Sequence, residues 1–323
     1  MDMIFEIKRK ISEALPADFF PGIYTVVSHL QMAEHYWQEA KGSIEEYLFT
    51  DAVLRANHAF EAALGEAYKL VCGKDPENLT VKQLYKYLDD QNVFKDKEAQ
   101  TFHRYLEDWE IPAETDEQLF YSEQEAMLAI LNVSAFFFIL VEQIIELASY
   151  EKAKYFLGWD RTEKIRQEIE RYGDGDKFLL DKIVALFRLF SADLFYIEER
   201  ENAPAEYEML GYLRGFLEVS VPELEVEIDK RVELGASHTH LDMLISLNET
   251  TVLIETKRSN QIKGSIFDID NAISQLSGYM TAIKKNKAVL FYLPILGSSD
   301  LATRNIEMEV DGVLQQIKVI YPQ

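Results

Sequence analysis

The sequence predicts a multidomain protein with an all-α N-terminal domain followed by a C-terminal α/β domain. Two observations support this prediction. Residues 1–155 carry apolar side chains three and four positions apart, the spacing of one helix face. From about residue 201, short runs alternate apolar and polar residues, as strands do. With 323 residues, the chain is long enough for two domains that each bury a core.

The helical half is expected to contain four main helices. Their apolar periodicity places them at 24–40, 48–71, 79–91 and 121–156. Thr80 and Ser122 stand where the third and fourth would begin, and hydroxyl side chains are favoured N-caps. The polar, proline-containing stretch 110–118 predicts a loop before the last helix.

The apolar run 126–141 resembles both a buried core helix and a membrane-spanning helix. It is 16 residues long, contains Asn132 and Ser134, and is bracketed by Glu125 and Glu142. A membrane-spanning helix needs roughly 18–20 apolar residues. We therefore expect a buried core helix and no membrane association, with a membrane helix as the alternative.

Residues 156–200 are expected to form a helical linker between the domains. Their helical periodicity is interrupted at Gly173-Asp174-Gly175-Asp176, which predicts a turn between two helices. A calcium loop is the alternative, but the full ligand spacing of such loops is missing.

Residues 201–323 carry the strand signals. A helix is expected to start near Pro204, because proline is favoured at the first helical position. Strands are expected at 225–233, 239–247, 250–257, 288–296 and 315–322, with a helix at 270–286 between the third and fourth. The second and third strands would form a hairpin that turns at Asn248-Glu249. This order predicts an α/β or α+β domain.

Three charged side chains interrupt the predicted hairpin. Glu255 and Lys257 are two residues apart, so they share one face of their strand. Asp242 lies on the antiparallel partner strand and would pair close to Glu255. Two neighbouring carboxylates repel each other unless a cation lies between them. Their hard oxygen ligands suit Mg²⁺ or Mn²⁺, which can activate water against a phosphodiester.

The pattern of Asp242 followed by Glu255-Thr256-Lys257 resembles the signature of the PD-(D/E)XK nuclease superfamily. The proline that leads this signature is replaced by Leu241. The resemblance implies a restriction-endonuclease-like α/β domain with a mixed central sheet at 201–323. It also implies a metal-dependent deoxyribonuclease, with Asp242, Glu255 and Lys257 as catalytic residues.

Further residues follow from the same resemblance. Gln275 and Tyr279 resemble the QxxxY element of the RecB-like branch and of type I restriction motor subunits. In that family such residues touch DNA or position the catalytic lysine, so Gln275 is also a candidate catalytic residue. An acid on the preceding helix often completes the metal site. We expect Glu206 to be this acid, because it is in phase with the apolar positions of its helix. Glu208 is the alternative.

Net charge is −23, which by itself argues against a nucleic-acid binder. Residues 1–150 carry most of the excess negative charge, with 27 acids against 12 bases, whereas residues 256–306 have a net charge of +4. Exposed charges are screened over about 8 Å at physiological salt, so a local basic face can act on an acidic protein. We expect DNA contacts from Arg258, Lys263, Gln275 and Tyr279.

His238 and His240 suggest a rival zinc site. The sequence HTHLD is similar to part of the metallo-β-lactamase and amidohydrolase motifs, but Met243 follows Asp242 where a histidine is needed. No later histidine exists in the chain, so the remaining zinc ligands are missing.

The helical domain resembles the HEPN-like domains that accompany nucleases in prokaryotic defence systems. The arginine-histidine ribonuclease motif of that group is absent. The domain is therefore expected to mediate homo-oligomerisation or to bind a partner such as an ATPase; a plain helical bundle is equally compatible. One cysteine and no signal-peptide pattern favour a reducing compartment, so we expect a cytoplasmic protein.

Two functions remain open from the sequence. The first is a metal-dependent DNA endonuclease that acts in prokaryotic restriction or antiviral defence, with RNA as the alternative substrate. The second is a catalytically inactive nuclease fold that binds nucleic acid or a partner protein. Intact Asp242, Glu255 and Lys257 favour the first.

Overall fold

The chain forms two compact units in a computed structural model, Met1–Ala148 and Ser149–Gln323. The structure describes residues 2–14, 21–42, 45, 47–91, 93–94, 102, 104–110, 120–173, 176–197, 204–234, 237–258, 266–293 and 300–322. The predicted loop 110–118 and the Asp174-Gly175 turn therefore lie almost entirely outside the described residues.

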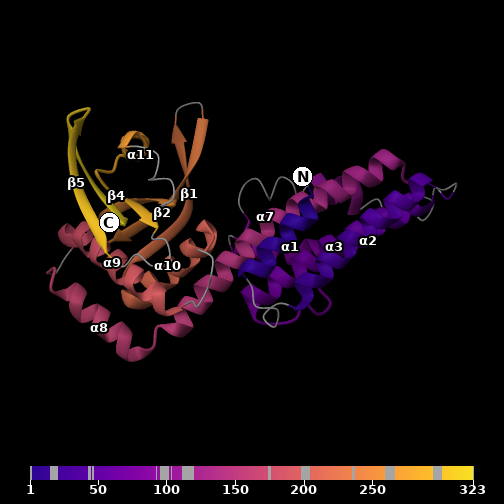
Figure 1. The fold of residues 1–323 in the computed structure, drawn as a ribbon, viewed down its shortest axis with the longest axis horizontal. Coiled ribbons are helices and arrows are strands. Elements are labelled where there is room, and N and C mark those ends of the chain that lie inside the picture. The colour runs from indigo at the N-terminus through magenta and orange to yellow at the C-terminus, as the bar shows by residue number, and fades with distance from the viewer. Residues whose placement is uncertain are drawn as a thin grey trace. The chain divides into compact units, whose positions relative to one another are not determined.

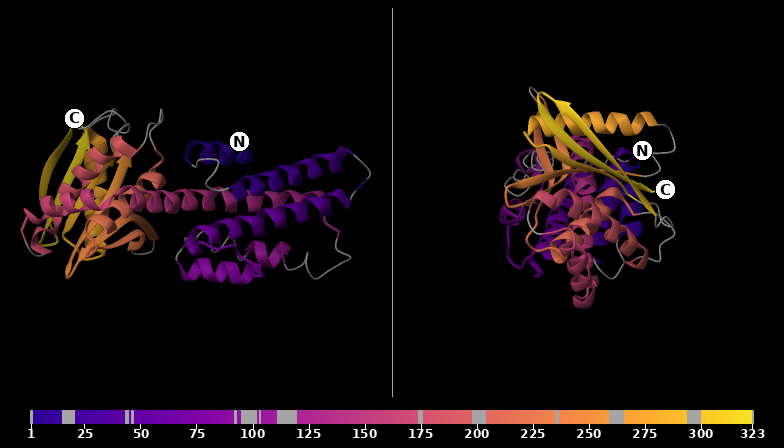
Figure 2. Two further views of the ribbon diagram at one scale, coloured as in Figure 1. Left: turned by 90° about the horizontal axis from the view of Figure 1, so that it is seen from below. Right: turned by 90° about the vertical axis from the view of Figure 1, so that its left-hand side faces the viewer.

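The first unit is helical, as the sequence predicts. Its elements are α1 (Met3–Ala14), α2 (Pro21–Gly42), α3 (Tyr47–Cys72), α4 (Val81–Asp90), the π-helical turn η1 (Leu106–Glu110) and α7 (Glu123–Phe156), which continues into the second unit. α2 and α3 lie side by side (Figures 1 and 2). Both predicted caps are confirmed: Thr80 Oγ1 accepts from Gln83 N, and Ser122 Oγ accepts from Glu125 N, each at 3.3 Å.

α7 is the core helix predicted from the apolar run. Among the described residues it is the one helix long and apolar enough to cross a membrane, but 61% of its most apolar 18-residue window is buried inside the protein. Phe136, Phe137 and Leu140 are fully buried. Phe136 packs against Phe60, with ring centroids 5.0 Å apart.

The described residues of the second unit form a six-stranded sheet. Its strands are β1 (Glu225–Leu234), β2 (Ser237–Leu247), β3 (Thr250–Arg258), β4 (Lys287–Leu293), β5 (Leu301–Val310) and β6 (Val313–Pro322), in the order β1-β2-β3-β4-β6-β5. β4 is parallel to β3 and to β6, and the other neighbours are antiparallel. The expected mixed sheet is confirmed. Asn248 has a φ of 53°, consistent with the predicted turn between β2 and β3.

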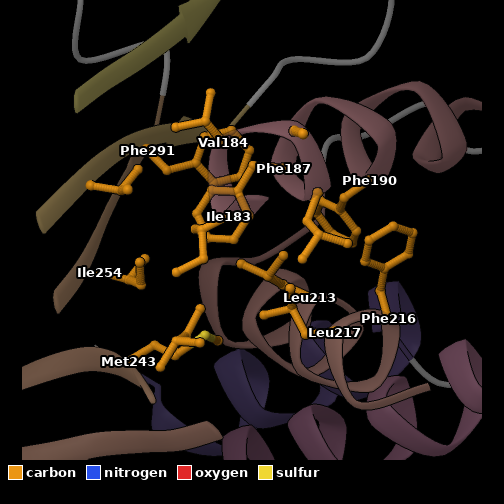
Figure 3. Packing of buried hydrophobic residues seen from close by; sticks show 14 of the residues in the cluster. Ile183, Val184, Phe187, Phe190, Leu213, Phe216, Leu217, Met243, Ile254 and Phe291 are labelled. Carbon is orange, nitrogen blue, oxygen red and sulfur yellow. The ribbon is translucent and has the colours of Figure 1, made fainter. Parts of the chain in front are cut away.

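Helices cover both faces of this sheet. They are α8 (Trp159–Glu170), the short 3₁₀-helix η2 (Asp176–Phe178), α9 (Leu179–Ile197), α10 (Glu206–Ser220) and α11 (Ile266–Ala282). α8, α9 and α10 build one core with one face of the strands, and α11 builds a second core on the other face (Figure 2). In the first core, Phe187 of α9 and Leu213 of α10 lie over Ile254 and Phe291 of the strands (Figure 3).

The segment expected to be a linker, 156–200, is helical but contributes to the core of the second unit. Ile183 and Phe187 of α9 are fully buried, and Phe187 packs against Phe291 of β4 with ring centroids 4.7 Å apart. The reason is that both faces of this sheet carry apolar side chains, and each face must pack against helices to be buried. The sequence pattern shows that α9 has an apolar face, but it does not show what that face contacts.

One strand, β5, was not expected from the sequence. Its residues are mostly exposed or half-buried, and among the described strands it pairs only with β6, so it forms an edge of the sheet. Its hydrophobic alternation is consequently weak. The missed signal was Asp311-Gly312, whose φ values of 52° and 77° match the two-residue turns that join hairpin strands.

Candidate functional site

β3 places Glu255 and Lys257 on one face, as its alternation predicts. Val252 and Ile254 belong to the core beneath α9 and α10, whereas Leu253 belongs to the core beneath α11. Glu255 and Lys257 follow Leu253 on that second face. Lys257 Nζ lies 2.5 Å from Glu255 Oε1, so the two side chains form an ion pair.

Asp242 lies where β2 separates from β3. The last paired residues of these strands are Met243 and Ile254, so Asp242 is the first residue beyond the ladder. Its Oδ2 accepts hydrogen bonds from Thr256 N at 2.6 Å and from Thr256 Oγ1 at 2.7 Å. The carboxylate thus takes the place of a strand carbonyl, and this fixes Asp242 beside the Glu255-Thr256-Lys257 segment.

Thr256 is a site residue that the sequence reasoning missed. It is fully buried, and both its backbone N–H and its hydroxyl donate to Asp242. The available signal was its polar hydroxyl at a strand position where Val252 and Ile254 are apolar. A buried hydroxyl needs a hydrogen-bond partner, and Asp242 is the nearest acceptor across the hairpin.

Glu255 is strained electrostatically. Only 5% of its surface is exposed, and burial, reinforced by the negative charges of Asp242 and Glu206, raises its pKa to about 7 despite the opposing ion pair with Lys257. Its Oε2 is buried and has no hydrogen-bond partner among the described residues. A buried oxygen of this kind gains most from a proton or a cation.

The two upstream acids occupy different positions. Glu206 is the first residue of α10, and its charge acts on both Glu255 and Lys257, raising the pKa of each. Glu208 is 2% exposed, and its Oε2 accepts a hydrogen bond from Ala205 N at 3.3 Å. Glu208 therefore caps its own helix, and Glu206 is the acid that belongs to the cluster.

Lys257 is held in its charged form. Burial lowers its pKa, but the hydrogen bond to Glu255 and the charges of Glu255, Asp242 and Glu206 raise it by more, so the net pKa is raised. A lysine in this state donates hydrogen bonds and positive charge. It does not accept a proton, so its chemical contribution is to hold an anionic oxygen or a water molecule.

The oxygen atoms of these residues are the kind that bind a divalent cation. Their arrangement, however, suits a bound cation only in part. Asp242, Glu255 and Glu206 are hard oxygen ligands, and the unpartnered Glu255 Oε2 is a free acceptor. However, no three acids, histidines or cysteines among the described residues stand close enough to hold a metal together. The site accordingly offers a carboxylate pair, with Glu206 at longer range.

Gln275 and Tyr279 lie on α11, four residues apart. Gln275 Nε2 donates to the Tyr279 hydroxyl, which also lies 3.3 Å from Thr239 Oγ1 of β2. Tyr279 is 4% exposed and belongs to the core beneath α11, whereas Gln275 is exposed. Tyr279 is thus a core aromatic whose polar end connects α11 to β2, three residues before Asp242.

The basic residues expected to contact DNA are described only in part. Arg258 ends β3, but its side chain lies outside the described residues, and so does Lys263. Lys284 and Lys285 follow α11, which runs back along the sheet. They therefore lie near the start of β4, at the opposite end from Lys257.

The two histidines do not form a zinc site with the described residues. His238 is exposed, and its ring centroid lies 6.0 Å from that of His240. His240 Nδ1 lies 3.2 Å from an oxygen of Asp229, which has a φ of 51° opposite Asp242 in the ladder. His240 thus helps to hold the β1–β2 hairpin at this bend.

Comparison of the chain with known proteins identifies no relative. No protein-family model matches it. No curated protein and no solved structure matches it either. The chemistry of the site residues is therefore the basis for assigning a function to the chain.

Proposed function

We propose that this protein is a metal-dependent nuclease that hydrolyses phosphodiester bonds in DNA. The observation that carries the proposal is Glu255 Oε2, a buried carboxylate oxygen without a described partner, beside Asp242 and on the same strand face as Lys257. Keeping one oxygen of a buried carboxylate without a hydrogen-bond partner costs stability. Residues that impose such a cost are common at functional sites.

The roles of the residues follow from their environments. Asp242 and Glu255 would hold Mg²⁺ or Mn²⁺, with Glu206 as a longer-range acid. Asp242 is oriented for this by Thr256, and Glu255 by Lys257. When bound, the metal would supply Lewis-acid polarisation of a phosphoryl oxygen and acidification of a water molecule. Lys257 would release Glu255 and donate to the scissile phosphate or to the attacking water.

The test is cleavage of plasmid and linear DNA by the purified chain, with Mg²⁺, with Mn²⁺ and with excess EDTA. We expect cleavage only with metal, and loss of cleavage in Asp242→Asn and Glu255→Gln. Glu249→Gln is the matched control, because this exposed acid lies in the turn between β2 and β3. Cleavage that persists in EDTA, or that survives both site substitutions, would overturn the proposal.

A second function is favoured by one feature of the same site. Asp242 Oδ2 already accepts two hydrogen bonds, and no three metal-binding side chains gather among the described residues. This arrangement would suit a nuclease fold that binds nucleic acid or a partner without cutting. Saturable DNA binding without cleavage under every metal condition would support this alternative.

The biological setting is proposed on the sequence resemblance alone. It comprises a cytoplasmic role in prokaryotic restriction or antiviral defence, with the acidic first unit serving homo-oligomerisation or binding a partner such as an ATPase. Parallel cleavage assays with single-stranded RNA test the alternative substrate.

A further inference from the structure

A pocket of about 210 Å³ lies on the second unit, away from the candidate active site. Lys287, the first residue of β4, lines it, whereas Lys257 pairs with Tyr292 further along the same strand. At about 3.3 Å per strand residue, the two positions are roughly 16 Å apart along the strand. The pocket is therefore distinct from the cluster of Asp242, Glu255 and Lys257.

Three lysines from three different elements line this pocket: Lys177 of η2, Lys287 of β4 and Lys318 of β6. Lys318 Nζ lies 2.5 Å from Asp181 Oδ1, so this lysine is already paired. A second carboxylate, Glu307 of β5, also lines the pocket. Its Oε1 accepts a hydrogen bond from Gln316 Nε2 at 3.0 Å.

Two of the lysines have no ion-pair partner among the described residues, although the Glu307 carboxylate also lines the pocket. Within the part of the chain that the structure describes, neither Lys177 nor Lys287 forms an ion pair; Lys177 Nζ lies 4.7 Å from the Phe178 ring centroid. Lys284 and Lys285 follow α11 close by in sequence and add positive charge at this end of the sheet. In a chain of net charge −23, such a local excess of lysines needs an explanation.

We propose that this pocket binds a phosphate group. Lys287 and Lys177 would supply charge-assisted hydrogen bonds, and the amide of Asn305 in the lining would supply a neutral donor. The Gln316 amide already donates to Glu307, so it is not counted as a donor to the phosphate. The volume agrees with this ligand class. A water molecule occupies about 30 Å³, so the pocket has room for roughly seven waters, or for a phosphate or pyrophosphate. Drug-sized ligands usually need about 300 Å³ or more.

The phosphate group could come from two sources, the backbone of a nucleic acid or a free phosphorylated small molecule. The experiment uses the full chain in EDTA at fixed ionic strength, and inorganic pyrophosphate is the first probe. Binding is measured by calorimetry and by the thermal shift of unfolding. We expect saturable binding that weakens about tenfold or more in Lys287→Gln, because one charge-assisted hydrogen bond is lost.

Lys284→Gln is the matched control. It removes the same charge from an exposed lysine that does not line the pocket, so it should change pyrophosphate affinity less than twofold. Lys287→Arg, which keeps the charge, should restore most of the binding. Absence of saturable pyrophosphate binding, or equal weakening in Lys284→Gln and Lys287→Gln, would overturn the proposal.

The second probe is a short duplex oligonucleotide, which identifies the source of the phosphate. Binding that weakens in Lys287→Gln in parallel with pyrophosphate binding indicates a nucleic-acid backbone. Oligonucleotide binding that is unaffected, while pyrophosphate binding is lost, indicates a free phosphorylated molecule. Both outcomes support the phosphate site, and neither depends on whether the cluster at Glu255 cleaves DNA.

Discussion

Asp242 and Thr256 are joined by two hydrogen bonds at the point where β2 leaves β3. The Asp242 carboxylate accepts from both the backbone N–H and the hydroxyl of Thr256, at 2.6 and 2.7 Å. Since Thr256 lies between Glu255 and Lys257, these bonds hold one acid of the proposed site against the strand that carries the other acid.

Thr256→Val should weaken both stability and activity. Valine keeps the shape but removes the hydroxyl donor, and hydrogen bonds to charged groups contribute about 1.5–3 kcal/mol. Because Asp242 is only partly buried, we expect a loss of about 1–2 kcal/mol in the free energy of unfolding. We also expect cleavage to need a higher Mg²⁺ concentration. Denaturant unfolding and Mg²⁺ titration measure the two effects; Thr256→Ser, which keeps the donor, should retain the Mg²⁺ response.

Glu255 should make the stability of the metal-free protein depend on pH. Its pKa in the folded protein is about 7, against 4.5 as the ordinary value. The folded state therefore binds more protons than the unfolded state between these values, and the free energy of unfolding falls as pH rises through this window. The effect should be roughly 2–3 kcal/mol.

Glu255→Gln isolates this contribution, because glutamine does not titrate. Urea unfolding in EDTA at pH 5 and pH 8 should show a stability gain of the variant over the wild type that is larger at pH 8. Parallel pH profiles for the two proteins would contradict the raised pKa.

Lys257→Ala should abolish cleavage and also affect the fold. Removing positioned electrostatic help in a transition state typically costs about 10²- to 10⁴-fold in rate. The same substitution removes the ion-pair partner of a buried carboxylate, so at pH 8 the variant should lose about 1–3 kcal/mol. At pH 5, where Glu255 is protonated, the loss should be smaller. Single-turnover cleavage and thermal unfolding at both pH values test this.

Gln275→Ala separates a role in the proposed site from a role in the core. Gln275 is exposed and its amide donates to the Tyr279 hydroxyl, so truncation should leave the melting temperature nearly unchanged. If the QxxxY resemblance reflects function, single-turnover cleavage should fall. Tyr279→Phe is the companion variant, because it removes only the hydroxyl shared with Thr239. Unchanged cleavage in both variants would assign the pair to packing alone.

Gly215→Ala should destabilise the second unit. A Cβ at this position of α10 would lie 2.6 Å from Tyr150 O and 2.9 Å from Ala153 Cβ, both on the last turns of α7. Overpacking of this kind costs about 1–3 kcal/mol. Gly278→Ala is the control, since an added Cβ there would meet no described atom within 4 Å outside its own stretch of helix. Alanine is also the better helix former, so this variant should gain about 0.5–1 kcal/mol. Thermal unfolding of the two variants should shift in opposite directions.

The sequence by itself determined the features that depend on local spacing. Strand alternation placed Glu255 and Lys257 on one face, and hydroxyl groups at the starts of helices identified the caps Thr80 and Ser122. Helical phase favoured Glu206 as the inward-facing acid of α10, but the structure buries Glu208, which caps its own helix, and leaves Glu206 half-buried. Backbone periodicity is fixed within a few residues, so a single sequence carries this information.

Only the tertiary structure decided how distant segments meet. The partner of Asp242 is Thr256, because the β2–β3 ladder ends one pair earlier, and no local pattern encodes where a ladder ends. α9, which was expected to be part of a linker, packs on the sheet and contributes to its core, because that face of the sheet is apolar and must be covered by helices. Lys287 lies at the far end of the sheet from Lys257, because α11 reverses the chain direction before β4 begins. These relationships depend on packing between residues far apart in sequence, where burial, not spacing, selects the contacts.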